Sequence, residues 1–273
     1  MLIGCHVSIA GGIQNAPERA HDLGCECFQM FTRSPQGGKA PEITQKILSD
    51  FKLQVTSCKL QAVYVHCPYY INFASANNRI RYGSVSVVRN ELERATLLGA
   101  KYVMTHLGSA GELSEKEASE KTIEMLKKTL DGYSGSAKLL IENSAGAGKI
   151  IGDDLSEIAE IINKVNHPSL VGICLDTQHS FASGYDWRDF ENTIKKIDTE
   201  IGLEKIKLIH TNDSLTEFNS KKDRHAHIGQ GQIGLDAFQN IVKFAKEKNI
   251  DMILETEHDK VKEDVEILKK LRG

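Results

Sequence analysis

Histidine and carboxylate side chains follow several short apolar runs of this sequence. The apolar run Gly172–Leu175 is followed by Asp176, and His179 stands three residues further on. Two other runs end in the same way, because His66 follows "VYV" and Glu142 follows "LLI". Short apolar runs are typical of buried strands. Each of these side chains is therefore expected at the mouth of a strand, and imidazole with carboxylate is a ligand set for zinc, manganese or iron.

The complete set of candidate metal ligands at or near the expected strand ends contains five histidines and four carboxylates: His66, His106, Glu142, Asp176, His179, His210, Asp223, His225 and Glu255. A single histidine or carboxylate at a strand end is usually a hydrogen-bonded or solvated residue. Four carboxylates gathered in one place would repel each other and lose solvation. Bound cations are the simplest compensation. Because catalytic zinc usually takes three protein ligands, nine ligands indicate two or three ions.

Eight apolar runs alternate with eight stretches of helical period. We predict strands over residues 2–6, 25–31, 62–66, 102–106, 139–142, 172–176, 206–210 and 252–255. We predict helices over residues 12–23, 44–58, 84–98, 114–131, 154–165, 187–201, 235–248 and 260–271. This alternation favours a parallel sheet with right-handed crossovers, and eight units close into an α/β barrel of the (β/α)8, or TIM, type. The active site of such a barrel lies at the C-terminal rim of its strands, where the nine side chains would meet.

Length and composition suit one folded domain. The chain has 273 residues, of which 40% are hydrophobic and 26% charged, so it can bury a sizeable core. We expect a single (β/α)8 barrel domain over residues 1–273, with an open, doubly wound sheet as the alternative. We expect no membrane span, because no apolar stretch approaches about 20 residues, and no signal peptide, because "MLIGCHVSIAGG" has no positively charged region and no cleavage site. The six cysteines are expected as thiols, which suits a cytoplasmic location.

Several segments are similar to those of endonuclease IV, the zinc-dependent apurinic/apyrimidinic endonuclease family of DNA base-excision repair. They are "GCHVSIAGG", "HLGS", "IENSAGAG", "CLDTQHSFASGYD", "HTNDS" and "DRHAHIGQGQIG". The resemblance extends from Ile3 to Glu255, and the fourth and sixth segments are the most specific to the family. It implies a xylose-isomerase-like TIM barrel with three zinc ions per chain, and Mn²⁺ could replace zinc at one site.

The resemblance also implies how the ligands are divided. One zinc would be held by His66, His106 and Glu142. Glu142, the expected catalytic residue, would bridge to a second zinc completed by Asp176, His210 and Glu255, and the third would be held by His179, Asp223 and His225. A hydroxide between two zinc ions would attack the phosphodiester 5′ to an abasic site and leave a 3′-hydroxyl. The family also trims blocked 3′ ends as a phosphodiesterase.

The expected partner is double-stranded DNA that contains abasic sites or blocked 3′ ends. We expect the protein to bind it as a monomer and, through the DNA, to associate with the nucleoid. The net charge of −3 argues mildly against DNA binding, but three divalent ions would outweigh four carboxylates at the site. Tyr69 matches the tyrosine that the family inserts into damaged DNA. Arg33, Lys39 and Arg224 are expected to contact phosphates.

The loop after the second strand departs from the family pattern. The family has an arginine and a tryptophan there, whereas this chain reads "TRSPQGGKAP", with Gln36, Gly37 and Gly38 in their place. This change is expected to affect recognition of the lesion more than hydrolysis, unless Arg33 takes over the missing role. The GxGxxG sequence at Gly229–Gly234 does not follow a strand, so we interpret it as a loop before a helix that could offer N–H groups to phosphate.

Two other functions remain open on the sequence. A sugar isomerase or epimerase on a related barrel would need only one or two metal ions, and His179, Asp223 and His225 would be superfluous. A DNA-damage binder without activity would not need a complete ligand set.

Overall fold

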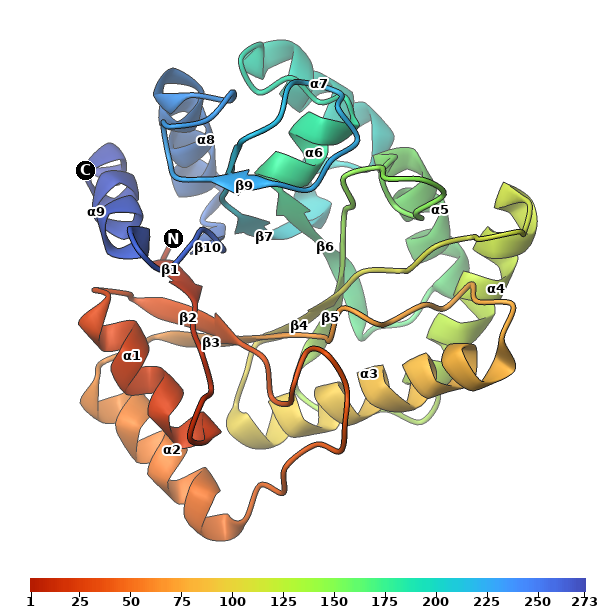
Figure 1. The fold of residues 1–273 in the computed structure, drawn as a ribbon, viewed down its shortest axis with the longest axis horizontal. Coiled ribbons are helices and arrows are strands. Elements are labelled where there is room, and N and C mark those ends of the chain that lie inside the picture. Colours follow the sequence, from red (N-terminus) through yellow and green to blue (C-terminus); the bar gives the residue numbers. More distant parts are fainter.

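The computed structural model describes residues 1–273, and its centre is a closed barrel of eight parallel strands (Figure 1). The strands neighbour one another in the order β1, β10, β7, β6, β5, β4, β3, β2. Their bounds are Ile3–His6 (β1), Cys27–Met30 (β2), Ala62–His66 (β3), Tyr102–Thr105 (β4), Lys138–Glu142 (β5), Leu170–Asp176 (β6), Ile206–His210 (β7) and Asp251–Leu254 (β10). The predicted TIM barrel is confirmed, and the open-sheet alternative is wrong because β1 pairs with both β2 and β10.

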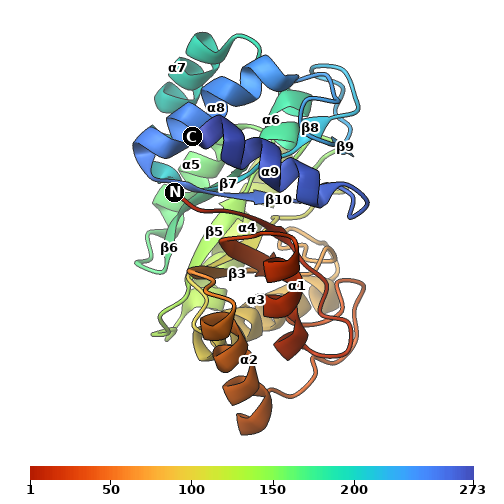
Figure 2. The same ribbon diagram turned by 90° about the vertical axis from the view of Figure 1, so that its left-hand side faces the viewer.

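Helices surround the barrel as an outer layer (Figures 1 and 2). The helices that follow the barrel strands and form this layer are α1 (Ala16–Asp22), α2 (Gln45–Ser57), α3 (Asn78–Leu98), α4 (Glu115–Leu130), α5 (Leu155–Val165), α7 (Phe190–Glu200), α8 (Leu235–Lys248) and α9 (Val261–Arg272). Short 3-10 turns, η1 (Ile13–Asn15) and η2 (Leu203–Lys205), precede α1 and β7. None of these helices is both long enough and apolar enough to cross a membrane.

Apolar side chains fill both faces of the barrel wall because side chains alternate along each strand. Seven fully buried residues pack together inside the barrel: Cys27, Tyr64, Met104, Leu140, Cys174, Leu208 and Ile253. A larger cluster of 64 buried residues lies between the strands and the helices. The interior is therefore a packed plug, and the space for chemistry lies above it, at the strand ends.

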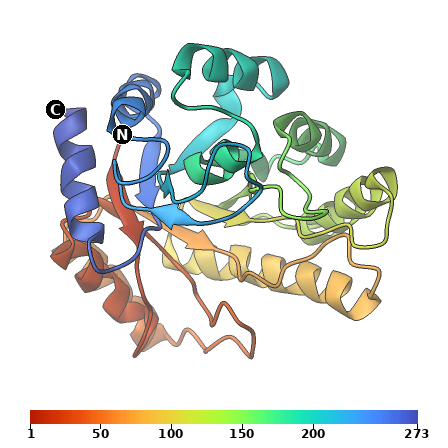
Figure 3. The same cartoon turned by 45° about the horizontal axis from the view of Figure 1, so that its top comes forward.

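Two elements were not predicted from the sequence. A short helix, α6 (Thr177–Ser183), begins directly after β6, and a two-stranded sheet forms between β8 (Asp213–Ser214) and β9 (His225–Ala226). Both lie at the same end of the barrel, over the mouth formed by the strand ends (Figure 3). Helix α3 also begins at Asn78 rather than at residue 84, because the side chain of Asn77 accepts a hydrogen bond from the amide of Arg79 and caps the helix earlier.

Leu208 tests the contribution of the interior plug to stability. Leu208→Ala removes a fully buried side chain two residues before His210, and we expect the free energy of unfolding to fall by about 2–5 kcal/mol. Urea denaturation of the metal-free protein measures this change. The matched control is Leu53→Ala, because Leu53 is 64% exposed and its truncation should change the free energy of unfolding by less than about 0.5 kcal/mol. Equal effects of the two substitutions would contradict a packed interior.

Candidate metal centre

The nine predicted ligands lie together at the C-terminal end of the barrel. Six of them stand at, or one residue beyond, the last residue of a strand: His66 (β3), His106 (β4), Glu142 (β5), Asp176 (β6), His210 (β7) and Glu255 (β10). The other three come from α6 and from the loop and strand after β8: His179, Asp223 and His225. Parallel strands end at one rim, so this clustering follows from the barrel itself.

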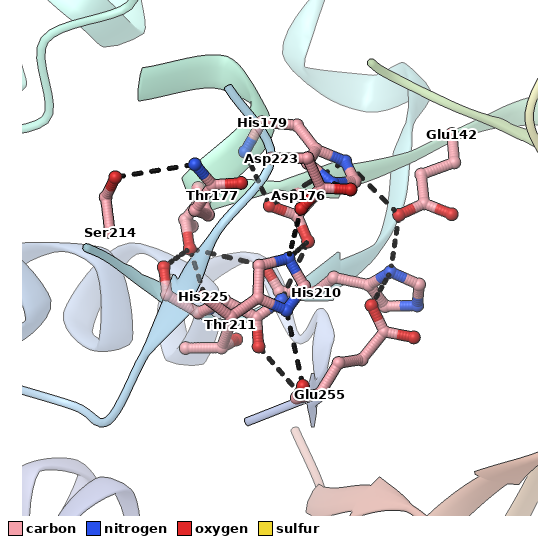
Figure 4. Close-up of polar contacts among 12 residues, drawn as sticks. Glu142, Asp176, Thr177, His179, His210, Thr211, Ser214, Asp223, His225 and Glu255 are labelled. Atoms are coloured by element: carbon pink, nitrogen blue, oxygen red, sulfur yellow. Dashed lines mark hydrogen bonds and ion pairs between the residues drawn. The ribbon is translucent and has the colours of Figure 1, made fainter. Parts of the chain in front are cut away.

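Glu142 lies between two groups of ligands. Its Oε2 atom is 2.8 Å from His66 Nε2 and 3.3 Å from His106 Nε2. Its Oε1 atom is 2.8 Å from His210 Nδ1 (Figure 4). The whole side chain is buried. One oxygen therefore faces His66 and His106 and the other faces His210, as a carboxylate shared by two cations requires.

A second group is formed by Glu142, Asp176, His210 and Glu255, whose ligand atoms lie within 4.8 Å of one another. The Oε2 atom of Glu255 is 3.2 Å from the same His210 Nδ1 that faces Glu142. Three carboxylates and one imidazole thus face one small volume.

The third group depends on the two unpredicted elements. Asp176 caps α6, because its Oδ1 accepts a hydrogen bond of 2.7 Å from the amide of His179, and this turn directs His179 into the site. Strand β9 places His225 opposite Ser214. Asp223 lies between the two imidazoles, with Oδ2 3.3 Å from His179 Nε2 and Oδ1 3.4 Å from His225 Nε2.

Backbone carbonyl groups orient three of these imidazoles. The Nδ1–H of His66 donates to the backbone carbonyl of Cys67 at 2.6 Å. The Nδ1–H of His179 donates to the backbone carbonyl of Asn143 at 3.0 Å, and that of His225 donates to the backbone carbonyl of Glu255 at 3.2 Å. A carbonyl only accepts, so Nδ1 carries the proton and Nε2 is the atom that can bind a metal. The Nε2 atoms of His179 and His225 are buried and have no hydrogen-bond partner. Two orphaned ring nitrogens beside a carboxylate fit a metal that prefers nitrogen and oxygen ligands.

The gathered charges change the pKa values of the ligands. Burial alone would lower the pKa of His179, yet the carboxylates of Asp176 and Asp223 raise it to about 10. Burial would raise the pKa of Glu142, yet the surrounding imidazoles hold it well below its usual range. The metal-free site therefore pairs a protonated His179 with ionised carboxylates, and a cation would replace that proton.

Two asparagines that the sequence analysis missed support the ligands. Asn212 Nδ2 donates to Asp176 Oδ2 at 2.7 Å, while its Oδ1 accepts from the amide of Glu255 at 2.8 Å. Asn143 Oδ1 accepts from the amide of Asp176 at 2.7 Å. The sequence contains a signal for both, because Asn143 directly follows Glu142 and Asn212 lies two residues after His210.

The residues expected to contact DNA differ in their accessibility. Tyr69 is 67% exposed, and its ring centroid lies 5.3 Å from that of Phe31 and 6.0 Å from that of His66, so it stands at the edge of the site. Lys39 and Arg224 are exposed. The prediction that Arg33 contacts DNA phosphates is wrong, because its side chain is buried and its guanidinium pairs with the fully buried Glu91 of α3. An arginine that neutralises a buried carboxylate is not free to contact phosphate or to fill a lesion.

The Gly229–Gly234 loop is also not available to phosphate. The buried carboxylate of Asp213 accepts hydrogen bonds from the amides of Gly229 and Gly231 at 3.0 Å and from that of Ile233 at 2.9 Å. Gly231 must be a glycine, because a Cβ atom there would lie 2.4 Å from the carbonyl oxygen of Ser214. The loop therefore encloses an anion supplied by the chain and leads from β9 into α8.

Comparisons with known proteins agree with this geometry. The model of the family described as xylose isomerase-like TIM barrel matches residues 17–271. The chain is 34% identical to a probable endonuclease 4 of Cenarchaeum symbiosum and 37% identical to one of Halothermothrix orenii, covering 100% of this chain and 99% of each relative. Endonuclease IV from Thermus thermophilus has a similar structure, with a TM-score of 0.87 and 31% identity over 100% of this chain and 98% of that one. A D-tagatose 3-epimerase-like protein shares the fold at 21% identity, with a TM-score of 0.77 over 99% of this chain and 97% of that one.

Metal binding should depend on pH, because ligands such as His179 must lose a proton to bind a cation. We expect the apparent affinity for Zn²⁺ to rise as the pH increases from about 6 to about 9, with protons released on binding. Calorimetry in buffers of different ionisation enthalpy measures the released protons. The His179→Gln protein removes one such imidazole and should release about one proton fewer. Affinity that did not change over this pH range would contradict the charge arrangement of the site.

Proposed function

Because the chain belongs to the endonuclease IV family of xylose isomerase-like TIM barrels, we propose that it hydrolyses the phosphodiester 5′ to abasic sites in duplex DNA. It is a metal-dependent nuclease with a role in DNA repair. The proposed products are an upstream fragment that ends in a 3′-hydroxyl and a downstream fragment that begins with the abasic residue and its 5′-phosphate, and blocked 3′ ends are further substrates. The proposed metal content is three Zn²⁺ ions per monomer, with Mn²⁺ able to replace one of them.

The single observation that carries this proposal is the division of nine ligands around Glu142. Its two oxygens face different imidazoles, and a third group formed by His179, Asp223 and His225 lies beside them. Phosphodiester hydrolysis develops negative charge on both the attacking and the leaving oxygen, so adjacent cation sites suit that reaction.

The protein's own residues hold and orient the reacting groups. When bound, zinc supplies positive charge that lowers the pKa of water toward about 7 and stabilises the leaving oxygen. His66, His106 and Glu142 would hold one ion, Glu142 would share a second with Asp176, His210 and Glu255, and His179, Asp223 and His225 would hold the third. Three divalent ions against four carboxylates leave a positive site, which attracts DNA to a chain of net charge −3.

The rim around the metals offers the contacts with DNA. Tyr69 projects from the loop between β3 and α3, and we propose that it fills the space left by an abasic nucleotide. We propose that the positive charges of Lys39 and Arg224 attract the phosphate backbone of the DNA. Gln36 and Gly38 are exposed in the loop after β2, where the family carries an arginine and an aromatic residue, so Tyr69 carries more of the recognition in this chain.

A sugar epimerase is the competing function on this fold. The epimerase-like structural neighbour is 21% identical, which shows the shared barrel alone. The third ligand group favours the nuclease, since one or two metal ions suffice for sugar isomerisation or epimerisation.

The decisive test of the function is cleavage of a labelled duplex with one reduced abasic analogue. The analogue cannot undergo β-elimination, so incision on its 5′ side must be hydrolysis. We expect incision by the zinc-loaded protein at the lesion and none after chelation. The Glu142→Ala protein, which lacks the shared carboxylate, should lose at least about 100-fold in rate. Incision of undamaged duplex at an equal rate, or no incision by zinc-loaded protein, would overturn the proposal.

Tyr69 provides a separate test of lesion recognition. We expect Tyr69→Ala to weaken binding to the abasic duplex by about tenfold or more, because stacking of an aromatic ring on a base contributes about 1–3 kcal/mol. Fluorescence anisotropy measures binding, and zinc content should not change. The matched control is Tyr102→Ala, since Tyr102 is the first residue of β4 and lies at the other end of the barrel. Equal affinities of the Tyr69→Ala and unmodified proteins for damaged duplex would refute the insertion role.

A further inference from the structure

Gln29 is a fully buried amide in a strand that contributes no metal ligand. It lies in β2, two residues after Cys27, which packs in the barrel interior, so Gln29 also faces inward. A buried amide must find hydrogen-bond partners. Its partners are three side chains of the metal centre or its edge, at or just beyond the ends of three other strands: His210, Glu255 and His6.

The chemistry of Glu255 decides how the Gln29 amide is oriented. Glu255 Oε1 lies 2.6 Å from one end of the amide, and an ionised carboxylate can only accept. That end must therefore be the NH₂ group, which donates to Glu255. Its second hydrogen is directed at His6 Nδ1, 2.9 Å away.

The opposite end of the amide is then an oxygen, and it sets the tautomer of His210. Gln29 Oε1 lies 2.7 Å from His210 Nε2, which must carry a proton to donate to it. The other ring nitrogen, Nδ1, faces Glu142 Oε1 at 2.8 Å and Glu255 Oε2 at 3.2 Å, so it is the atom that offers its lone pair to a cation.

The same amide also gives the two oxygens of Glu255 different partners. Oε1 accepts the hydrogen bond from Gln29, and Oε2 remains directed toward His210 Nδ1 and the ligand group. His66, His179 and His225 are oriented by backbone carbonyls, which no substitution can remove. His210 alone among the ligand histidines is oriented by an uncharged side chain.

We propose that Gln29 is a positioning residue of the metal centre, which sets the tautomer of His210 and the orientation of Glu255 through one amide. This inference rests on the proposed metal-dependent function. Partners of this kind typically change metal affinity or activity by about 10–100-fold when they are removed. The effect should be confined to the ion held by His210 and Glu255, because Gln29 contacts no ligand of the His179, Asp223 and His225 group.

Gln29→Met is the test, because methionine has a similar length and neither donates nor accepts strongly. The reconstituted protein is titrated with a chelating dye that competes for Zn²⁺. We expect one of the bound ions to dissociate about 10–100-fold more readily than in the unmodified protein, while the others keep their affinity. The control is Tyr64→Phe, because Tyr64 lies directly opposite Gln29 in the register of β3, is equally buried, and bonds Asp251 instead of a ligand.

Nuclear magnetic resonance of zinc-loaded protein with ¹⁵N-labelled histidine provides a readout independent of activity. The Nε2–H of His210 should exchange slowly with water in the unmodified protein and rapidly in Gln29→Met. Gln29→Glu separates the two contacts, because glutamate still accepts from His210 but cannot donate to Glu255. It should keep the slow proton and still weaken zinc binding, and it replaces Gln29→Met if that protein does not fold.

The outcomes distinguish the inference from the function on which it rests. Unchanged zinc affinity and a slow His210 proton in Gln29→Met would overturn the role of Gln29 alone. Failure of the unmodified protein to bind zinc would overturn the metal-dependent function as well. Equal loss of zinc in Tyr64→Phe would reduce the effect to general destabilisation of the barrel and would also overturn the inference.

Discussion

The interaction on which the structure depends is the attraction between the buried carboxylate of Glu142 and the cations around it. Glu142 is fully buried, and three imidazoles lie within 3.3 Å of its two oxygens. An ionised group at this depth is very unfavourable without paired charge. In the metal-free protein the carboxylates raise the pKa values of His66 and His210 despite their burial, so these imidazoles can supply that charge as protons, and in the proposed active enzyme divalent ions supply it more strongly. The remaining features of the barrel mouth serve to keep these groups in place.

The barrel provides the required rigidity through its backbone. Parallel strands end at one rim, so ligands that are far apart in the sequence meet there without long loops. The carbonyl groups that follow the strands then orient His66, His179 and His225. Because the packed interior fixes the backbone, it also fixes the orientation of these imidazoles. The side-chain amides of Asn143, Asn212 and Gln29 add hydrogen bonds that hold Asp176, Glu255 and His210.

The rim that we propose to contact DNA is not held by such buried hydrogen bonds. Tyr69 is exposed, and its ring lies beside those of Phe31 and His66, so it could enter a substrate without disturbing the core. Arg33 stands in the loop before it in the sequence but is committed to Glu91, and Asp213 occupies the amide groups of the glycine-rich loop. Positive charge and free N–H groups in the sequence are therefore available to a ligand only where the chain does not use them itself.

The sequence by itself determined the barrel and the rim at which its candidate metal ligands meet. Strand ends can be read from short apolar runs, and in a parallel barrel every strand end reaches the same rim, so His66, Glu142, Asp176 and His210 could be placed together without a structure. Only the tertiary structure decided how the amides and the rim are used. Gln29 contacts His210 across 181 residues of sequence, and Arg33 contacts Glu91 across 58. Side-chain pairing at such separations depends on packing in three dimensions, whereas the alternation along a strand is a local property that the residues themselves display.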